Sequence, residues 1–362
     1  MTAVDNAQVG HELDLEQVEA FAQKVATDQA ITSNAVLAYL GDRLGLWRTL
    51  AETDAVTSEE LAGRTGLAER YLREWLAAQA AAGYLAYEPH TRRFRLSAEH
   101  AAVLADDDSP AALAGGFEFN AAIWATVDRL AHAYTTGEGI GWHEQDPRLF
   151  PAVERFFRPL YRTSVIDAWL PAVDGLVDRL QRGIRVLDVG CGFGTATLLI
   201  GHAFPASTVV GVDNHGDSIR RASLAAEQVG APDNVTFTQA DAHEYGGGPY
   251  DLICFFDTVH DLGDPVGALQ HARSALAPDG VVFVVEPAAA DALEDNLHPL
   301  GLSWYASSAT VCLPGSLSQP GHAGLGAQAG PSQLIEVFTR AGFSVTRQVA
   351  ATPFNLVFEA RH

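Results

Sequence analysis

The sequence is poor in cysteine and in positive charge, and it lacks a long apolar run. Its three cysteines, Cys191, Cys254 and Cys312, form no C-x-x-C pair, as suits a reducing cytoplasm. There are 23 lysines and arginines against 45 aspartates and glutamates, and the net charge of -22 disfavours a polyanion or an anionic membrane as partner. No apolar run approaches the roughly 20 residues that span a bilayer, and no basic-then-apolar leader opens the chain. These absences predict a cytoplasmic protein that binds neither nucleic acid nor membrane.

The chain is long and apolar enough for more than one folded unit. Its 362 residues exceed one ordinary domain, and its 48% apolar composition can form a substantial core. We expect three parts. They are a helical, winged-helix-like dimerisation domain over residues 1–108, a helical connector contributing to a substrate pocket over 109–171, and an α/β domain over 172–362.

The first part has the element order of a winged helix. Leu72, Trp75, Leu76 and Gln79 lie on one face of a predicted helix. The expected elements are helices over 15–30 and 32–46, a short helix opened by the capping-box pattern of 57–60, a helix over 68–82, and a hairpin with strands 84–87 and 93–96. The segment 109–170 is expected to be helical, with breaks near 137–141 and at Pro147.

From Gly183 onward, short apolar strands alternate with helices, which predicts a mostly parallel sheet covered on both faces. The seven expected strands are 185–189, 207–212, 235–239, 252–256, 281–285, 344–349 and 355–359, with a late helix at 332–341. The segment 314–331 is rich in glycine, serine and proline and is expected to be a loop. A lid is slightly favoured over a merely slack connection.

A glycine-rich turn follows the first of these strands and opens a helix. It carries Asp188, Gly190, Cys191 and Gly192 in the spacing G-x-G-x-G. Glycines allow close approach of a ligand, and a helix N-terminus presents free N–H groups to an anion. The spacing differs from the G-x-G-x-x-G of dinucleotide-binding enzymes, so the expected anion is a carboxylate rather than a pyrophosphate.

Three further elements follow the next strands. Asp213, followed by Asn214, closes the second strand, where a carboxylate can accept both ribose hydroxyls. Asp241 and Ala242 follow the third strand, placed to contact an adenine edge, and Phe256 ends the fourth. The alternative for Asp213 and Asp241 is that each only caps a helix.

These four elements, in this order, resemble the class I S-adenosylmethionine-dependent methyltransferases. Residues 257–261, Pro265 and 277–281 are similar to the FDxxHD…P…LxPGG pattern of a bacterial, actinobacterial-type subfamily. That subfamily has a winged-helix N-terminal domain and is related to small-molecule O-methyltransferases. The resemblance covers nearly the whole chain and implies an α/β, Rossmann-like, seven-stranded methyltransferase domain, with S-adenosyl-L-methionine as cofactor and S-adenosyl-L-homocysteine as product. Glu286-Pro287 departs from it, because many relatives have Asp there.

His260 is the candidate general base, since it follows the fourth strand and has an ordinary pKa near neutral pH. The resemblance also implies a catalytic histidine in this region. The alternative is that His260 caps a helix or bonds Asp261 without touching substrate. Asp261 could orient the ring, although a surface helix cap is the preferred interpretation, and Asp257 is expected to be structural. Candidate acceptor-pocket residues are Phe117, Phe119, Trp124, Trp142, His143, Phe150, Tyr161, Trp304 and Tyr305. No metal site is expected, because the histidines are scattered.

The expected activity is methyl transfer to an oxygen of an aromatic or natural-product-like small molecule. A winged-helix transcription regulator is disfavoured, because Arg70 and Arg73 are offset by Glu69 and Glu74. An NAD-dependent oxidoreductase is disfavoured by the glycine spacing. N- or C-methylation, or a non-methylating reaction on the same fold, stays open. The apolar helices of the first part are expected to form a homodimer.

Overall fold

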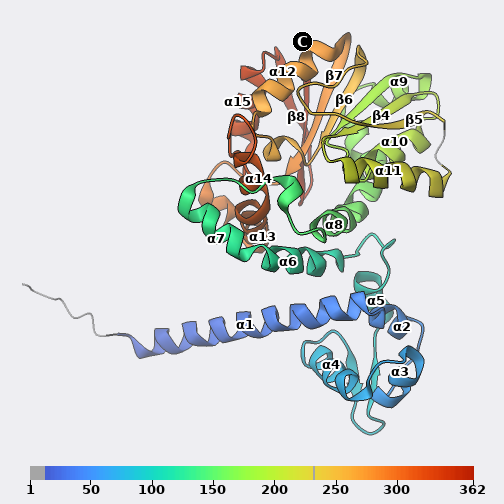
Figure 1. Ribbon diagram of the computed structural model, residues 1–362, viewed down its shortest axis with the longest axis vertical. Coiled ribbons are helices and arrows are strands. Elements are labelled where there is room, and N and C mark those ends of the chain that lie inside the picture. The colour runs from blue at the N-terminus through green and yellow to red at the C-terminus, as the bar shows by residue number, and fades with distance from the viewer. Residues whose placement is uncertain (1–12, 231–232) are drawn as a thin grey trace, which may run out of the picture. The chain divides into compact units, whose positions relative to one another are not determined.

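The computed structural model describes residues 13–230 and 233–362, and the chain divides into two compact units with the boundary between Asp106 and Asp107 (Figure 1). Among the described helices, none is long and apolar enough to cross a membrane. The expected order of a helical unit followed by an α/β unit is present.

The N-terminal unit is helical with one small hairpin. Its elements are α1 (Leu15–Arg43), α2 (Leu46–Ala51), α3 (Ser58–Thr65), α4 (Glu69–Ala81), the antiparallel strands β1 (Ala86–Glu88) and β2 (Arg93–Arg95), and α5 (Ala98–Leu104). The expected capping box opens α3, with Thr57 and Glu60 bonding each other's backbone N–H. The predicted inner face of α4 is confirmed, because Leu72, Trp75 and the other two residues of that face are buried.

One prediction in this unit is wrong. The sequence suggested separate helices over 15–30 and 32–46, whereas α1 runs unbroken for 29 residues. Neither glycine nor proline interrupts the helix near residue 31, and the Thr32 hydroxyl donates to the carbonyl of Asp28 at 2.8 Å, within the helical backbone. With no breaker, the helical hydrogen bonds simply continue.

The second unit begins with helices and continues into the sheet. Its first elements are α6 (Gly115–Ala125), α7 (Val127–Thr136), the 3-10 turn η1 (Trp142–Glu144), α8 (Leu149–Ser164), the short turns η2 (Val165–Trp169) and η3 (Leu170–Ala172), and α9 (Leu176–Arg182). The predicted breaks lie between α7 and α8, as expected. A further break at Thr126 separates α6 from α7 and was not anticipated.

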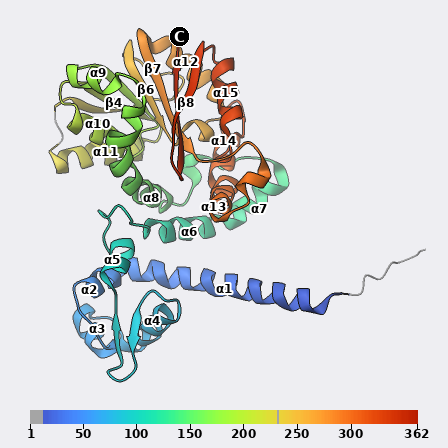
Figure 2. The same ribbon diagram turned by 180° about the vertical axis from the view of Figure 1, so that it is seen from behind.

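Seven strands form one sheet in the order β5-β4-β3-β6-β7-β9-β8 (Figures 1 and 2). They are β3 (Arg185–Val189), β4 (Thr208–Asp213), β5 (Val235–Gln239), β6 (Tyr250–Phe256), β7 (Leu276–Pro287), β8 (Val345–Ala351) and β9 (Asn355–Arg361). The pairs from β5 to β7 are parallel, and β9 pairs antiparallel with both neighbours. The predicted fold class is therefore confirmed.

Helices cover both faces of this sheet. Helices α10 (Thr195–Ala203) and α9 pack with η2 on one side, in a cluster that includes Trp169, Ile200 and Phe283. Helices α12 (Pro265–Ala275) and α15 (Pro331–Arg340) pack on the other side, around Leu269, Phe338 and Phe358. Helix α11 (Gly216–Val229) lies between β4 and β5 in the chain.

The chain order fixes where a ligand can bind. From β3 the chain moves outward to β4 and β5, then crosses back to β6 on the other side of β3. In such sheets the loops after neighbouring strands diverge at this switch point and leave a crevice at the carboxyl ends of the strands. The candidate residues after β3, β4, β5 and β6 all lie at that edge.

Candidate functional site

The glycine-rich loop between β3 and α10 is held by β4. The backbone N–H groups of Gly190 and Cys191 donate to the carbonyl of Val212 at 2.8 and 3.0 Å. Gly190 has a φ of 73°, and a Cβ there would lie 2.5 Å from Thr258, so only glycine fits. At Gly192, with φ of 55°, a Cβ would meet nothing within 4 Å among the described atoms. The loop is thus anchored on one side and leaves room at Gly192.

The first turn of α10 has the features of an anion site. Its N-cap is Gly194, which supplies no side chain to cap the helix. The first N–H groups of a helix lack partners within the helix, and their dipoles favour a negative charge. These donors suit a ligand carboxylate, in line with the sequence-based expectation.

Asp188 provides a buried negative group beside the loop. Thr197 donates its hydroxyl to Asp188 Oδ2 at 2.6 Å, while Oδ1 is buried and has no hydrogen-bond partner in the described chain. Burial raises the pKa of Asp188 to about 7, against the opposing effect of the Thr197 hydrogen bond. An orphaned carboxylate oxygen is satisfied by a cationic donor, such as the ammonium of an amino acid. Asp188 and the α10 N-terminus together fit the two charged ends of an amino-acid moiety.

Asp213 ends β4 and joins two loops. Its Oδ2 accepts from the Gly192 N–H at 2.9 Å and its Oδ1 from the His215 N–H at 2.8 Å. Burial raises the pKa of Asp213, and the hydrogen bonds from His215 and Gly192 oppose this. Each carboxylate oxygen has a second lone pair, so both can still accept from a ribose hydroxyl. Asp213 therefore fits ribose binding and also holds the glycine loop.

The β5 end adds Asp241 and Ala242 to this edge. Asp241 accepts from the backbone N–H of His243 at 2.9 Å and lies 2.7 Å from its Nδ1. Burial alone would raise the pKa of Asp241, but the hydrogen bonds from His243 outweigh it and the pKa is lowered. The side chain of Asn214, an exposed residue, also hydrogen-bonds Asp241 and makes a smaller contribution in the same direction. The helix-cap alternative therefore describes part of what Asp213 and Asp241 do, because both bond backbone N–H groups.

Phe256 ends β6 within an aromatic cluster. Its ring centroid lies 5.8 Å from that of Tyr161 and 6.4 Å from that of Trp169. The Tyr161 hydroxyl donates to Asp257 Oδ2 at 2.9 Å, and the Asn355 side chain donates to Asp257 Oδ1 at 3.0 Å. Burial raises the pKa of Asp257 to about 7. Asp257 links α8, β6 and β9, as a structural residue does.

His260 forms a buried pair with Glu286. His260 lies in η4 (Val259–Asp261), is 4% exposed, and places Nδ1 2.6 Å from Glu286 Oε2. Glu286, near the end of β7, is 1% exposed, and its Oε1 accepts from the Val259 N–H at 2.8 Å. A carboxylate on Nδ1 fixes the tautomer and leaves Nε2 as the reactive nitrogen. In the sequence, Glu286 stood out only as a departure from the family pattern, and its pairing with His260 was not predicted, although one signal existed: an acidic residue directly after the apolar run 281–285.

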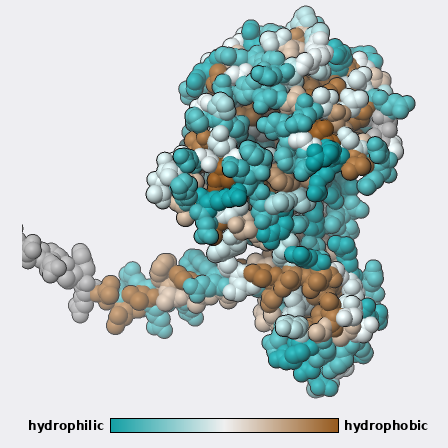
Figure 3. All heavy atoms as spheres, in the orientation of Figure 1, coloured by the Kyte–Doolittle hydropathy of each residue, from teal (hydrophilic) through white to brown (hydrophobic). Residues whose placement is uncertain are grey.

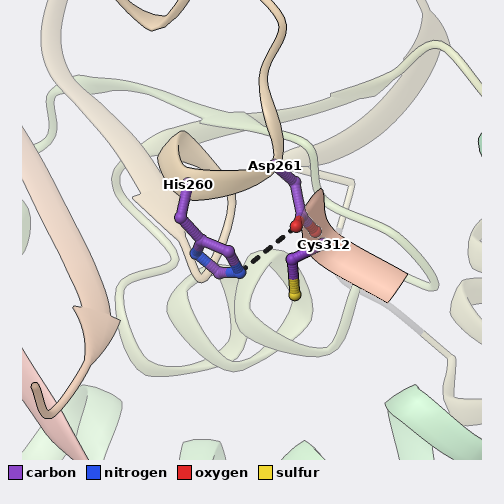
Figure 4. Close-up of side chains that lie close together, drawn as sticks. All are labelled: His260, Asp261 and Cys312. Atoms are coloured by element: carbon purple, nitrogen blue, oxygen red, sulfur yellow. Dashed lines mark ion pairs between the residues drawn. The ribbon is translucent and has the colours of Figure 1, made fainter. Parts of the chain in front are cut away.

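Asp261 lies at the opposite ring nitrogen. Its Oδ1 is 3.3 Å from His260 Nε2, and Figure 4 shows the two side chains facing each other. Asp261 is therefore not the residue that orients Nδ1, and it is more than a surface helix cap. Burial by itself would lower the pKa of His260, but the negative charges of Asp261 and Glu286 outweigh it and hold that pKa well above its ordinary value.

Cys312 completes this group from a distant part of the chain. It ends η6 (Ser308–Cys312), which follows α13 (Pro299–Ser307), and its Sγ lies within 4.8 Å of the ligand atoms of His260 and Asp261 (Figure 4). Burial, followed by the charge of Asp261, raises the pKa of the Cys312 thiol to about 12. The sequence-based expectation treated the histidines as scattered and did not foresee this grouping.

The segment 314–331 is fastened over η4 and is not a simple loop. It begins within α14 (Leu313–Leu317), a helix that the sequence analysis did not predict. Gln319 donates to the carbonyl of Asp261 at 2.8 Å, and the Gly326 N–H donates to the carbonyl of His260 at 3.2 Å. The cover is built from hydrogen bonds to the backbone, for which composition gives no signal.

Only some of the predicted pocket aromatics gather in one place: Phe119 and Trp142 pack against the same buried cluster around Leu149 and Val311. Trp142 packs edge-on against Phe150 at 5.5 Å, and Phe150 stacks on His215 at 4.4 Å, next to the Asp213 strand end. Trp304 is buried and lies edge-on to Phe156 at 6.5 Å, whereas Trp124 is 63% exposed. Among the remaining candidates, Phe117 and Phe119 are half-buried in α6, whereas His143 and Tyr305 are exposed. The Tyr161 hydroxyl is already bonded to Asp257.

The chain is similar to known methyltransferases in its sequence and in its fold. Residues 161–348 match the family model described as a methyltransferase domain, and residues 32–106 match an Rv2258c-like winged HTH domain. The chain is 31% identical to the ubiquinone biosynthesis O-methyltransferase of Paracidovorax citrulli over 134 residues, covering 36% of this chain and 53% of that protein. It is 32% identical to the trans-aconitate 2-methyltransferase of Yersinia pseudotuberculosis over 141 residues, covering 38% and 51%. The chain thus spans about half of these relatives' length.

Solved structures share the fold over nearly the whole chain. The mitomycin 7-O-methyltransferase MmcR matches with a TM-score of 0.72 and 21% identity, covering 96% of this chain and all (100%) of that one. Human N-acetylserotonin methyltransferase, in complex with SAM, matches with a TM-score of 0.69 and 18% identity, covering 97% and 99%. Since the methyltransferase model covers more than half of the chain and its predicted sheet is present, the protein belongs to the methyltransferase domain family and carries a winged HTH domain before it.

Proposed function

We propose that this protein transfers a methyl group from S-adenosyl-L-methionine to an oxygen of a small molecule. The observation that carries the proposal is the buried His260–Glu286 pair at the end of β6, the strand that pairs with β3 and its glycine-rich loop. S-adenosylmethionine supplies an electrophilic methyl group, and an acceptor hydroxyl needs only alignment and loss of its proton.

Each residue of the candidate site has a proposed role in binding the cofactor or in removing the acceptor proton. Asp188 and the α10 N-terminus would hold the amino-acid end of the cofactor, and Asp213 its ribose hydroxyls. Asn214, Asp241 and Ala242 would flank the base. His260 Nε2 would take the acceptor proton, while Glu286 holds Nδ1 and balances the charge of the resulting imidazolium.

The acceptor is proposed to be an aromatic or natural-product-like molecule with an ionisable hydroxyl. Relatives and structural neighbours named as O-methyltransferases support this choice. The test is incubation of the protein with S-adenosylmethionine and a panel of phenols, carboxylic acids and amines, with mass spectrometry of the products. Methylation of phenols alone would support it. Methylation restricted to amines, or no product from any acceptor, would contradict it.

Turnover should rise with pH. Deprotonated His260 is the active base, and its pKa is held well above its ordinary value by Asp261 and Glu286, against the effect of burial. Below that pKa the active fraction falls about tenfold per pH unit. Glu286→Gln keeps an acceptor for Nδ1–H but removes one charge, so the rising limb should move to lower pH. The measurement is kcat against pH in metal-free buffer for both proteins. An unshifted limb in the variant would contradict the assignment.

The N-terminal unit is proposed to form a homodimer. Helix α1 exposes several large apolar side chains: Leu15, Val18, Phe21, Ile31, Val36 and Leu40. Figure 3 shows brown, apolar surface along this helix. Exposed apolar surface of this extent marks an association site. Light scattering is expected to give twice the chain mass. The variant Val18→Glu/Phe21→Glu should give monomers, and Lys24→Glu on the same helix should remain dimeric. A monomeric wild type would refute the proposal.

DNA binding is not part of the proposed function, although the winged HTH match gives it a specific basis. In α4, Arg70 pairs with Glu74 at 2.6 Å and Arg73 with Glu69 at 2.8 Å. Arginines already paired with carboxylates neutralise few phosphates. Salt-sensitive binding to duplex DNA would favour a transcription regulator instead.

The protein is proposed to be cytoplasmic. Its three cysteines are free, which suits a reducing compartment.

A further inference from the structure

We propose that His260, Asp261 and Cys312 form a Zn²⁺ site that overlaps the base, with His260 Nε2, an Asp261 oxygen and Cys312 Sγ as ligands. The three ligand atoms lie within 4.8 Å of one another, and Figure 4 shows the side chains converging from η4 and η6. Imidazole, carboxylate and thiolate are the donors that zinc takes in proteins.

The distance between the histidine and aspartate ligand atoms suits a metal between them. Ligand atoms about 2.0–2.3 Å from zinc in a tetrahedron lie roughly 3.3–3.8 Å apart. His260 Nε2 and Asp261 Oδ1 are 3.3 Å apart already. Three protein ligands leave the fourth position for water, as in open zinc sites.

The second ring nitrogen is held as in a metal-bound histidine. His260 Nδ1 lies 2.6 Å from Glu286 Oε2 and donates its proton there. This directs the Nε2 lone pair toward Asp261. A carboxylate behind the ring is the usual outer partner of a histidine that binds zinc.

Asp261 gives an independent indication that a cation belongs here. Its Oδ1 is shielded from solvent and accepts no hydrogen bond from the described residues, although Nε2 lies close by. A neutral His260 would place a lone pair against this oxygen, which is repulsive. Either a proton on Nε2 or a metal ion between the two atoms removes the repulsion.

Access and charge are compatible with zinc. His260 and Cys312 are buried, but the Asp261 side chain is 30% exposed and offers a way in from solvent. On binding, protonated His260 releases its Nε2 proton and the Cys312 thiol releases its own proton, both to solvent. The resulting thiolate and the Asp261 carboxylate contribute two negative charges. These two charges balance Zn²⁺ without any redox step.

Zinc and the proton would compete for Nε2. A zinc-loaded chain could not use His260 as a base, so zinc should inhibit methyl transfer reversibly. Binding itself needs no turnover, so it can be tested even if the proposed acceptor class is wrong.

The experiment uses the full chain after removal of metals with a chelator. Co²⁺, a spectroscopic probe for zinc, is expected to bind one equivalent and to give the near-ultraviolet charge-transfer band of a thiolate–cobalt bond. Cys312→Ser should abolish the band, and Cys254→Ala, a buried cysteine in β6, should retain it. Glu286→Gln should weaken Zn²⁺ binding about 10–100-fold in chelator competition. His243→Ala, which removes a histidine whose Nδ1 lies 2.7 Å from Asp241, should leave the Zn²⁺ affinity unchanged.

Two results would overturn the proposal: no band in the wild-type protein, or a band that survives Cys312→Ser. Should Cys312→Ser fail to fold, Asp261→Asn provides the second variant, and unchanged zinc affinity there would also refute it. If His260→Ala lowers turnover, zinc that binds to the wild type without lowering it would exclude Nε2 as a ligand.

Discussion

Replacing His260 with alanine is expected to lower the turnover of a phenolic acceptor by about 10²–10⁴-fold, the usual contribution of a positioned base. The ring lies in η4 at the end of β6, with Nδ1 held by Glu286, so its loss removes the proton acceptor without touching the glycine-rich loop. Affinity for S-adenosylmethionine should stay nearly intact. The measurement is kcat in metal-free buffer, with calorimetric titration of the cofactor.

The matched control is His132→Ala, an exposed histidine in α7 that should leave turnover unchanged. The loss at His260 should be greater for a phenol than for a carboxylic acid, which needs little help to lose its proton. Turnover of the phenol within a few-fold of wild type would show that His260 is structural. Methyl transfer would then depend on alignment of the reactants alone.

Asp213→Ala is expected to weaken S-adenosylmethionine binding by about 1–3 kcal/mol, the cost of losing hydrogen bonds to a charged group. The effect should have two sources, because Asp213 is proposed to accept from the ribose hydroxyls and also holds the N–H groups of Gly192 and His215. Calorimetric titration measures it directly. Asp217→Ala is the control: it removes an exposed carboxylate paired with Arg220 in the first turn of α11 and should bind the cofactor normally.

Asp213→Asn separates the two sources. An amide keeps one acceptor for the loop N–H groups but lacks the charge and the paired oxygens that suit two ribose hydroxyls. We expect it to bind the cofactor less well than wild type and better than the alanine variant. Unchanged affinity in both variants would remove Asp213 from the cofactor site.

Local sequence patterns determined the part of the candidate site that is proposed to bind the cofactor. The apolar strand, the glycine turn and the following helix lie within residues 185–203, and each is encoded by neighbouring residues. The same holds for Asp213 and Asp241, because the ends of parallel strands meet at one edge of the sheet. The face of α4 with Leu72 and Trp75 was predictable for the same reason, since helical periodicity is a local property.

The tertiary structure alone decided what surrounds His260. Glu286 is 26 residues away along the chain and reaches Nδ1 only because β6 and β7 are neighbours in register. Cys312 lies beside His260 because η6 packs next to η4. The segment 314–331 is held against η4 by hydrogen bonds that the Gln319 side chain and the Gly326 N–H donate to backbone carbonyls of η4. Such contacts depend on how helices and strands pack together. The periodic spacing of residues within one helix or strand therefore does not predict them. The sequence located His260 as the candidate base, and the packing of distant segments set its charge, its partners and its access to solvent.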